Sequence, residues 1–148
     1  MHNKLAKTDQ AQQQPFTAAA KAQVMAKTEM PEKQWLKYEA AVKVGLFKLR
    51  TAYPTQSRNY NATEADALTA LWLENFCETC PDVLLEAVAR FIKADRKGFF
   101  PAPGLIMAFV DEIEAEKRFW EDVRRNHERN KRFLAEMSDP PLRIDDDQ

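Results

Sequence analysis

The fold is decided where residues 95–110 read DRKGFFPAPGLIMAFV. This stretch holds two of the chain's three glycines, two prolines and an adjacent pair of phenylalanines. Gly98 can adopt the left-handed conformation that ends a helix, and Pro103 suits the first turn of the next one. Phe99 and Phe100 have large apolar areas, so we expect both to pack into a core. The stretch therefore predicts a rigid corner between two packed helices.

Helical patterns lie on both sides of this corner. The chain has few glycines and shows no sustained strand-like alternation of Val, Ile and Thr, so no sheet is expected. Four helices are expected, from Pro31 to Tyr53, after a cap at Asn61 or Thr63, from Pro81 to near Gly98, and from Pro103 for more than about thirty residues. The predicted fold class is all-α, a compact bundle of about four helices with a long charged C-terminal helix and loose termini.

Composition divides the chain into four segments. Residues 1–29 are rich in Gln and Ala and have few large apolar side chains, so they are expected to form a mobile arm, with a short nascent helix around Ala18–Ala26 as an open alternative. Residues 30–116 carry the apolar periodicity of a helical core domain, and residues 117–137 read as an extended charged helix. An acidic disordered tail is expected from 138 to 148.

Charge and hydropathy limit the class of protein. The 148 residues include 22 Lys plus Arg and 23 Asp plus Glu, so the formal net charge is −1. A near-neutral chain gives no global reason to expect a nucleic-acid or membrane-surface protein. No apolar run is long enough for a membrane span, and glutamines rather than apolar residues follow the first lysines, so no secretory signal is expected. With two cysteines and no sign of export, we expect a cytoplasmic protein.

The sequence offers no set of residues for catalysis. It lacks the pattern GxxxxGK[ST], so we expect no P-loop for a nucleotide. Cys77 and Cys80 have a metal-like spacing, but structural zinc needs about four ligands, and they are expected to be helix-end thiols. His127 lies among charged residues and is expected to be a solvated surface histidine. We therefore expect no catalytic residue, no metal site, no cofactor and no enzymatic activity.

Local charge is more informative than net charge. Between Lys117 and Arg132 the chain has seven basic and three acidic residues, interleaved with large apolar side chains. Positive charge also suits the C-terminal end of a helix dipole, so a merely solvated face is the alternative. A helix carrying aromatic residues among arginines is suited to dock in a groove of a partner protein. The candidate partner-binding residues are Phe119, Trp120, Val123, Arg124, Arg125, Arg129, Arg132 and Phe133.

Three segments carry a resemblance to a known family. They are LRTAYP at 49–54, ALTALW at 67–72 and CPDVLLEAVARFIKADRKGFFPAPGLI at 80–106. In this order they resemble the bacteriophage replicative-helicase loader and inhibitor family. The features that carry the likeness are a helix ending in Tyr53 and Pro54, a helix with Trp72, the apolar segment from Leu85 to Ile92, and the corner from Phe100 to Pro103.

The resemblance implies a small helical adaptor without nucleotide chemistry of its own. Such an adaptor binds a ring-shaped replicative helicase, loads or inhibits it, and can deliver it to a replication initiator protein. In that family the helicase contact lies C-terminal to the packed helices. The alternative is a small helical DNA-binding replication or regulatory module, whose candidate nucleic-acid contacts at the corner are Lys93, Arg96 and Lys97. The near-neutral charge argues against it, and the sequence leaves direct DNA contact open.

Overall fold

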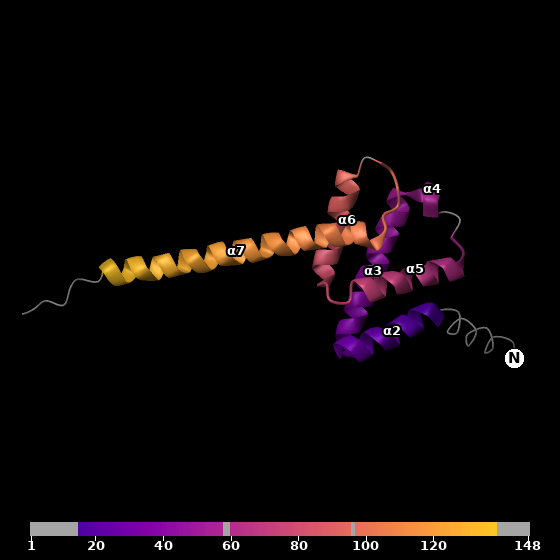
Figure 1. Cartoon of the computed structure of the whole chain (residues 1–148), viewed down its shortest axis with the longest axis horizontal. Coiled ribbons are helices and arrows are strands. Elements are labelled where there is room, and N and C mark those ends of the chain that lie inside the picture. The colour runs from indigo at the N-terminus through magenta and orange to yellow at the C-terminus, as the bar shows by residue number, and fades with distance from the viewer. Residues whose placement is uncertain (1–14, 58–59, 96, 139–148) are drawn as a thin grey trace, which may run out of the picture. The chain divides into compact units, whose positions relative to one another are not determined.

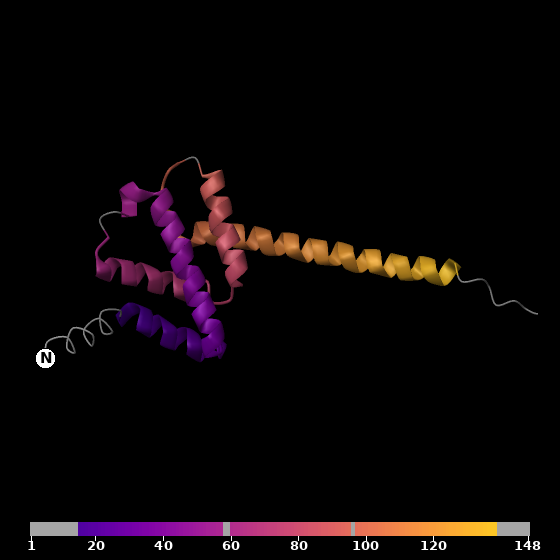
Figure 2. The same ribbon diagram turned by 180° about the vertical axis from the view of Figure 1, so that it is seen from behind.

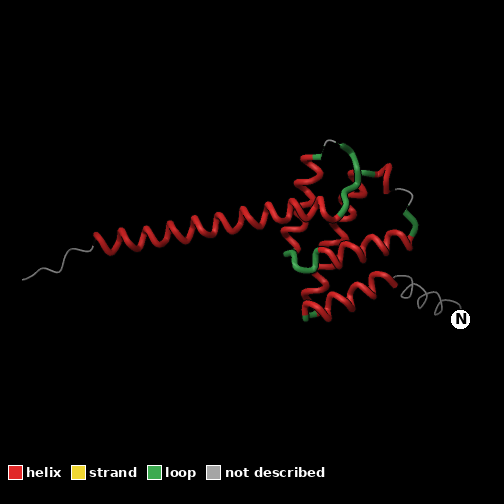
Figure 3. The backbone as a smooth tube through the Cα atoms, viewed as in Figure 1, coloured by secondary structure: helices red, strands yellow, loops and turns green. Residues whose placement is uncertain are grey.

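The computed structural model describes residues 15–57, 60–95 and 97–138. Every regular element in these ranges is a helix, and Figure 3 draws them in red with short loops between them. The predicted all-α class is therefore confirmed. The elements are α2 (Pro15–Thr28), α3 (Glu32–Ala52), the single turn α4 (Pro54–Ser57), α5 (Ala62–Asn75), α6 (Pro81–Ala94) and α7 (Pro103–Ser138), as labelled in Figure 1.

The chain forms two compact units, Met1–Ile113 and Glu114–Gln148. Helix α7 crosses the boundary, so its first turns belong to the first unit and its remaining turns make the helical part of the second. The prediction that the last helix exceeds thirty residues is confirmed, since α7 has 36. The expected tail from 139 onward and the first 14 residues of the expected arm lie outside the described residues.

The core of the first unit is built around two tryptophans and a tyrosine. Trp35 and Tyr38 of α3 pack edge to face, with ring centroids 5.7 Å apart, and Trp72 of α5 is also fully buried. The Tyr38 hydroxyl donates a hydrogen bond to the carbonyl oxygen of Leu73. Burial raises the pKa of Tyr38 far above its usual range, so this hydroxyl remains a neutral donor. Side chains from all the long helices of the unit meet here, and α7 contributes Ile106, Val110 and Ile113.

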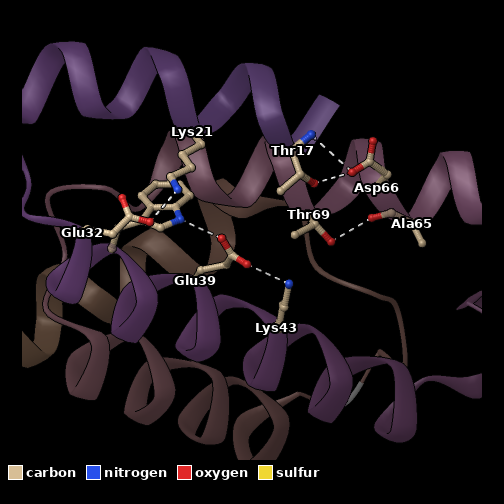
Figure 4. A network of polar contacts seen from close by, with 9 residues as sticks. Thr17, Lys21, Glu32, Glu39, Lys43, Ala65, Asp66 and Thr69 are labelled. Carbon is tan, nitrogen blue, oxygen red and sulfur yellow. Dashed lines mark hydrogen bonds and ion pairs between the residues drawn. The ribbon is translucent and has the colours of Figure 1, made fainter. Parts of the chain in front are cut away.

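Helix α2 corrects one expectation from the sequence. Residues 15–28 were expected to belong to a mobile arm, but they form a helix that lies along α5 in both views (Figure 1, Figure 2). Ala20 and Val24 are small, and their burial in the core lets α2 lie close to its neighbours. On α5, Asp66 accepts hydrogen bonds from the backbone N–H groups of Phe16 and Thr17, at 3.0 and 3.2 Å. Figure 4 shows the contact between Thr17 and Asp66, in which the Thr17 hydroxyl also donates to the carboxylate. The Asp66 carboxylate therefore caps the positive end of α2 from a distant part of the chain.

The corner after α6 is partly as expected. Gly98 has a φ of +74°, which confirms its left-handed conformation. The helix ends earlier than expected, at Ala94, because the Asp95 carboxylate accepts the N–H groups of Lys97 and Gly98 at 3.1 and 3.0 Å. Phe100 packs against the core, but Phe99 is 66% exposed, so the expectation that both are buried is wrong. Adjacent side chains of an extended segment point to opposite sides, and only one of these two can face the core.

Candidate functional site

The second unit presents a helix with no buried side chain. Every described side chain of α7 from residue 115 onward is exposed. Six of them are large and apolar, and Trp120 and Phe119 are 63% and 59% exposed. The six are Phe119, Trp120, Val123, Phe133, Leu134 and Met137. Apolar area held in water is unfavourable, so a concentration of such side chains marks a surface suited to a partner.

These side chains follow the spacing of a helix seam. Steps of three and four residues alternate along Trp120, Val123, His127, Asn130, Leu134 and Met137. Phe119 and Phe133 lie beside this seam, and we call the eight residues together the α7 stripe. The residues at 119, 120 and 123 form one apolar cluster, and those at 133, 134 and 137 form a second. Since a helix rises about 1.5 Å per residue, Trp120 and Leu134 lie about 21 Å apart along the axis, with His127 and Asn130 between them.

Charged residues cover the rest of this helix in regular rows. Lys117, Arg124 and Lys131 recur every seven residues and border the stripe on one side. The helical spacing places Arg125 and Arg132 on the opposite side of the helix, and Arg129 nearer the other border of the stripe. Of the predicted partner-binding residues, the four apolar ones and Arg124 thus share one surface, whereas Arg125 and Arg132 do not.

The same charges explain how this segment remains helical. Pairs of opposite charge lie four residues apart, as in Glu121 with Arg125 and Glu128 with Arg132, and each such pair stabilises a helix by about 0.2–0.5 kcal/mol. Arg125 also contacts Asp122, with 3.3 Å between nitrogen and oxygen. These charge pairs stabilise the helix without any burial of the apolar stripe.

Two apolar residues of the stripe were not among the predicted partner-binding residues. Leu134 and Met137 are exposed and continue the seam by one further turn. The signal that could have found them was the alternation of three and four residues, which extends past the basic region between 117 and 132.

The candidate nucleic-acid contacts at the corner lie in a different setting. Lys93 is an exposed residue of the last turn of α6, and Arg96 lies outside the described residues. Lys97 borders an apolar groove of about 440 Å³. The groove is lined by Phe91, Ala94, Asp95, Lys97, Phe99, Leu105 and Phe109. Among the described residues of this lining, Lys97 is basic and Asp95 is acidic, so they do not form a basic patch for a phosphate backbone.

The titratable groups of the corner serve its structure. The Tyr53 hydroxyl donates to the Asp95 carboxylate, with 2.7 Å between the oxygens. Burial, together with this hydrogen bond, raises the pKa of Tyr53 to about 12. The same bond lowers the pKa of Asp95 below its ordinary value. The pair joins the end of α3 to the start of the corner, which fixes where the connector leaves α6.

Metal-ligating residues do not gather within the described ranges. Cys77 is buried, Cys80 is exposed, and neither forms a disulfide. Across residues 15–57, 60–95 and 97–138, no three His, Cys, Asp or Glu side chains are grouped so that they could hold a metal ion. In the same part of the chain, no helix has both the length and the apolar character needed to cross a membrane.

Comparisons of the chain with protein-family models, with curated proteins and with solved structures find no match.

Proposed function

We propose that the protein is a non-enzymatic replication adaptor, which binds a replicative DNA helicase through the α7 stripe and loads or inhibits it. The observation that carries the proposal is the exposed apolar stripe on a helix that forms without burying it. The resemblance of residues 49–54, 67–72 and 80–106 to phage helicase loaders and inhibitors selects a helicase as the partner. A replication initiator is the proposed second partner, and the cytoplasm of a cell carrying the phage or prophage is the proposed setting.

The stripe suggests how such an adaptor acts by binding alone. Two apolar clusters about 21 Å apart can enter two pockets of a helical groove, and the polar residues His127 and Asn130 between them fix the register. Trp and Arg dominate the binding energy of many protein interfaces, and Trp120 and Arg124 lie on this surface. A helicase held in this way is either kept off its template or carried to it, and neither outcome requires nucleotide hydrolysis by the adaptor.

Co-purification of the full chain with the replicative helicase of its host or phage tests the proposal. We expect a complex whose affinity falls at least about thirtyfold in the double variant Phe119→Ala/Trp120→Ala, because truncation of interface aromatic residues costs about 2 kcal/mol or more. Phe16→Ala is the matched control, since Phe16 is an exposed phenylalanine of α2 in the first unit. No complex with the full chain, or equal affinity in the double variant, would contradict the proposal.

Mass measurement of the chain alone completes this test. A helix seam can also pair two copies of one chain, and a dimer that dissociates in the double variant would assign the stripe to self-association instead.

The excess of basic residues between 117 and 132 favours DNA binding as the second candidate function. Titration of duplex DNA against salt distinguishes it, because binding through phosphates falls steeply as salt rises. Under the DNA-binding alternative, replacing Arg124 and Arg125 by Gln weakens this binding and Trp120→Ala does not. Under the adaptor proposal, the Trp120→Ala substitution is the one that abolishes the functional complex.

A further inference from the structure

Helix α3 has a second exposed apolar surface, in the first unit. Leu36, Ala40, Val44 and Phe47 follow at steps of four, four and three residues, so they share one face of the helix. Phe47 is 70% exposed and Leu36 is 58% exposed. We call these four residues the α3 row. Leu36, Ala40 and Val44 lie in the i±4 line of side chains that forms a ridge when helices pack together.

The core does not account for this row. The opposite face of α3 already buries Trp35, Val42, Leu46 and Leu49 against the rest of the bundle. A Cβ placed on Gly45 would meet Cγ2 of Val88 at 3.4 Å, so α3 lies close against α6. The helix is therefore held firmly by one face while it presents the other, and a rigid support of this kind favours a precise docking surface.

The surroundings of the row are basic. Helix α3 carries five Lys and Arg and two Asp and Glu. One of the two acidic side chains, Glu39, accepts hydrogen bonds from Lys43 at 2.9 Å and from the indole N–H of Trp35 at 2.7 Å. Burial raises the pKa of Glu39, but these hydrogen bonds and the nearby lysine charges outweigh it, so the pKa is lowered. The Glu39 carboxylate is therefore charged and already paired within the helix. Lys33, Lys37 and Lys48 are exposed, and none of the three has an ion-pair partner among the described residues.

We propose that the α3 row docks an acidic amphipathic helix of a partner protein. The small side chain of Ala40 leaves room between Leu36 and Val44 for one apolar side chain of that helix. Glutamates or aspartates beside the apolar face of the partner helix would lie near Lys37 and Lys48. This charge complementarity favours an acidic partner helix over a basic one. This inference does not rest on the proposed function, because it uses no residue of the α7 stripe.

The dimensions of the row favour a helix over a lipid surface. From Leu36 to Phe47 it extends about 17 Å, at about 1.5 Å per residue. It is one side chain wide, and one of its four members is an alanine. Helices that lie in a membrane interface bury a broad face of large apolar residues, and the α3 row does not provide one.

Titration of the full chain with a designed peptide tests this inference. The probe is a fluorescent helical peptide of about 20 residues, with leucines at i, i+4, i+7 and i+11 and glutamates beside them. A second peptide keeps the leucines and replaces every glutamate by lysine. We expect the acidic peptide to bind the full chain at least about tenfold more tightly than the basic one.

Variants of the α3 row sharpen the same titration. Phe47→Ala and Leu36→Ala should each weaken binding of the acidic peptide. The double variant should lower the affinity for this peptide by about tenfold or more. The charge reversal Lys37→Glu/Lys48→Glu should weaken the acidic peptide and strengthen the basic one. Phe16→Ala is the matched control and should leave binding unchanged, since Phe16 is an exposed phenylalanine of α2 and belongs to neither the α3 row nor the α7 stripe. Because Phe47 and Leu36 are exposed, both variants should fold normally, and circular dichroism checks this.

Four outcomes would overturn the inference. They are failure of the acidic peptide to bind, equal binding of the two peptides, binding that Phe47→Ala and Leu36→Ala leave unchanged, and occupation of the row by something other than a partner helix. A dimer of the full chain that dissociates in Phe47→Ala would assign the row to a second copy. Adsorption to phosphatidylglycerol vesicles that is lost in Phe47→Ala would assign it to a lipid surface. Helicase binding through α7 is a separate measurement, so either proposal can fail while the other stands.

Discussion

Two regions of this molecule place the same kind of side chain in opposite environments. Trp35 and Trp72 are completely buried in the first unit, whereas Trp120 of the second unit is 63% exposed. In the first unit, apolar positions of each helix meet side chains from segments distant in the sequence. From residue 115 to 138, by contrast, every side chain of the described helix is exposed. Large aromatic residues therefore stabilise the fold in one region and remain available for binding in the other.

Substitution of a buried and of an exposed tryptophan should change the free energy of unfolding by very different amounts. Trp72→Ala removes a large buried side chain and should lower the free energy of unfolding by about 3–5 kcal/mol. Trp120→Ala removes an exposed one and should change it by no more than about 0.5 kcal/mol. Urea titrations followed by circular dichroism measure both values. Similar losses in the two variants would show that the second unit also depends on its aromatic residues for folding.

The attachment of α2 gives the next largest expected effect. Asp66→Ala leaves the first N–H groups of α2 without their acceptor, which should lower the free energy of unfolding by about 1–3 kcal/mol. Hydrogen exchange should accelerate mainly in residues 15–28. Glu74→Ala, an exposed carboxylate on the same helix, is the control and should have little effect. Unchanged exchange of α2 in Asp66→Ala would mean that apolar contacts alone hold it.

Two glycines offer a matched test of the corner. Both have open space where a Cβ would lie, but only Gly98 has a positive φ. Gly98→Ala should lower the free energy of unfolding by about 1 kcal/mol through backbone strain. Gly104 lies in the first turn of α7, and Gly104→Ala should instead stabilise by up to about 1 kcal/mol. If Gly98→Ala left the free energy of unfolding unchanged, the connector would readily adopt another conformation.

The smallest effect is a pH dependence at the same corner. Because the hydrogen bond from Tyr53 lowers the pKa of Asp95 from its ordinary 3.8, the charged carboxylate contributes stability at neutral pH. That contribution should disappear as the pH falls from 3.8 through the lowered pKa of the folded state. At neutral pH, the urea midpoint of Asp95→Asn should be lower than that of the unsubstituted chain. As the pH falls over this range, the midpoint of the variant should decrease less. A variant as sensitive to acid as the natural chain would place the responsible carboxylate elsewhere.

Local signals in the sequence were sufficient for most of the helices. Prolines and caps act within a few residues, so the starts of α3, α6 and α7 lie at or next to the prolines at 31, 81 and 103. The Asn61 side chain accepts the N–H of Glu64 at 2.8 Å, which confirms one of the two predicted caps of α5. The left-handed Gly98 is likewise a property of a single residue.

Long-range contacts explain what the sequence did not predict. Helix α2 depends on Asp66, which lies about fifty positions further along the chain than the residues it caps, and no local pattern indicates that pairing. Phe99 and Phe100 are the same residue type, and only the path of the backbone through the corner decides which of them is buried.

One of the two candidate binding surfaces could be predicted from local sequence, and the other could not. The aromatic part of the α7 stripe could be predicted because its arginines and periodicity are local. The spacing of Trp35, Val42, Leu46 and Leu49 predicts the buried face of α3 correctly, but the α3 row was not predicted, because the exposure of a second apolar face follows only from the packing.

Hydrogen exchange of the full chain, with and without its replicative helicase, shows whether the α7 stripe is the surface that binds the helicase. Amides of the α7 segment from 117 to 137 lie in an exposed helix and should exchange quickly in the free chain. We predict that saturating helicase slows their exchange by at least about tenfold and leaves exchange in the core of the first unit unchanged. Unchanged exchange across the α7 stripe in a chain that has bound the helicase, or protection confined to the first unit, would contradict this prediction.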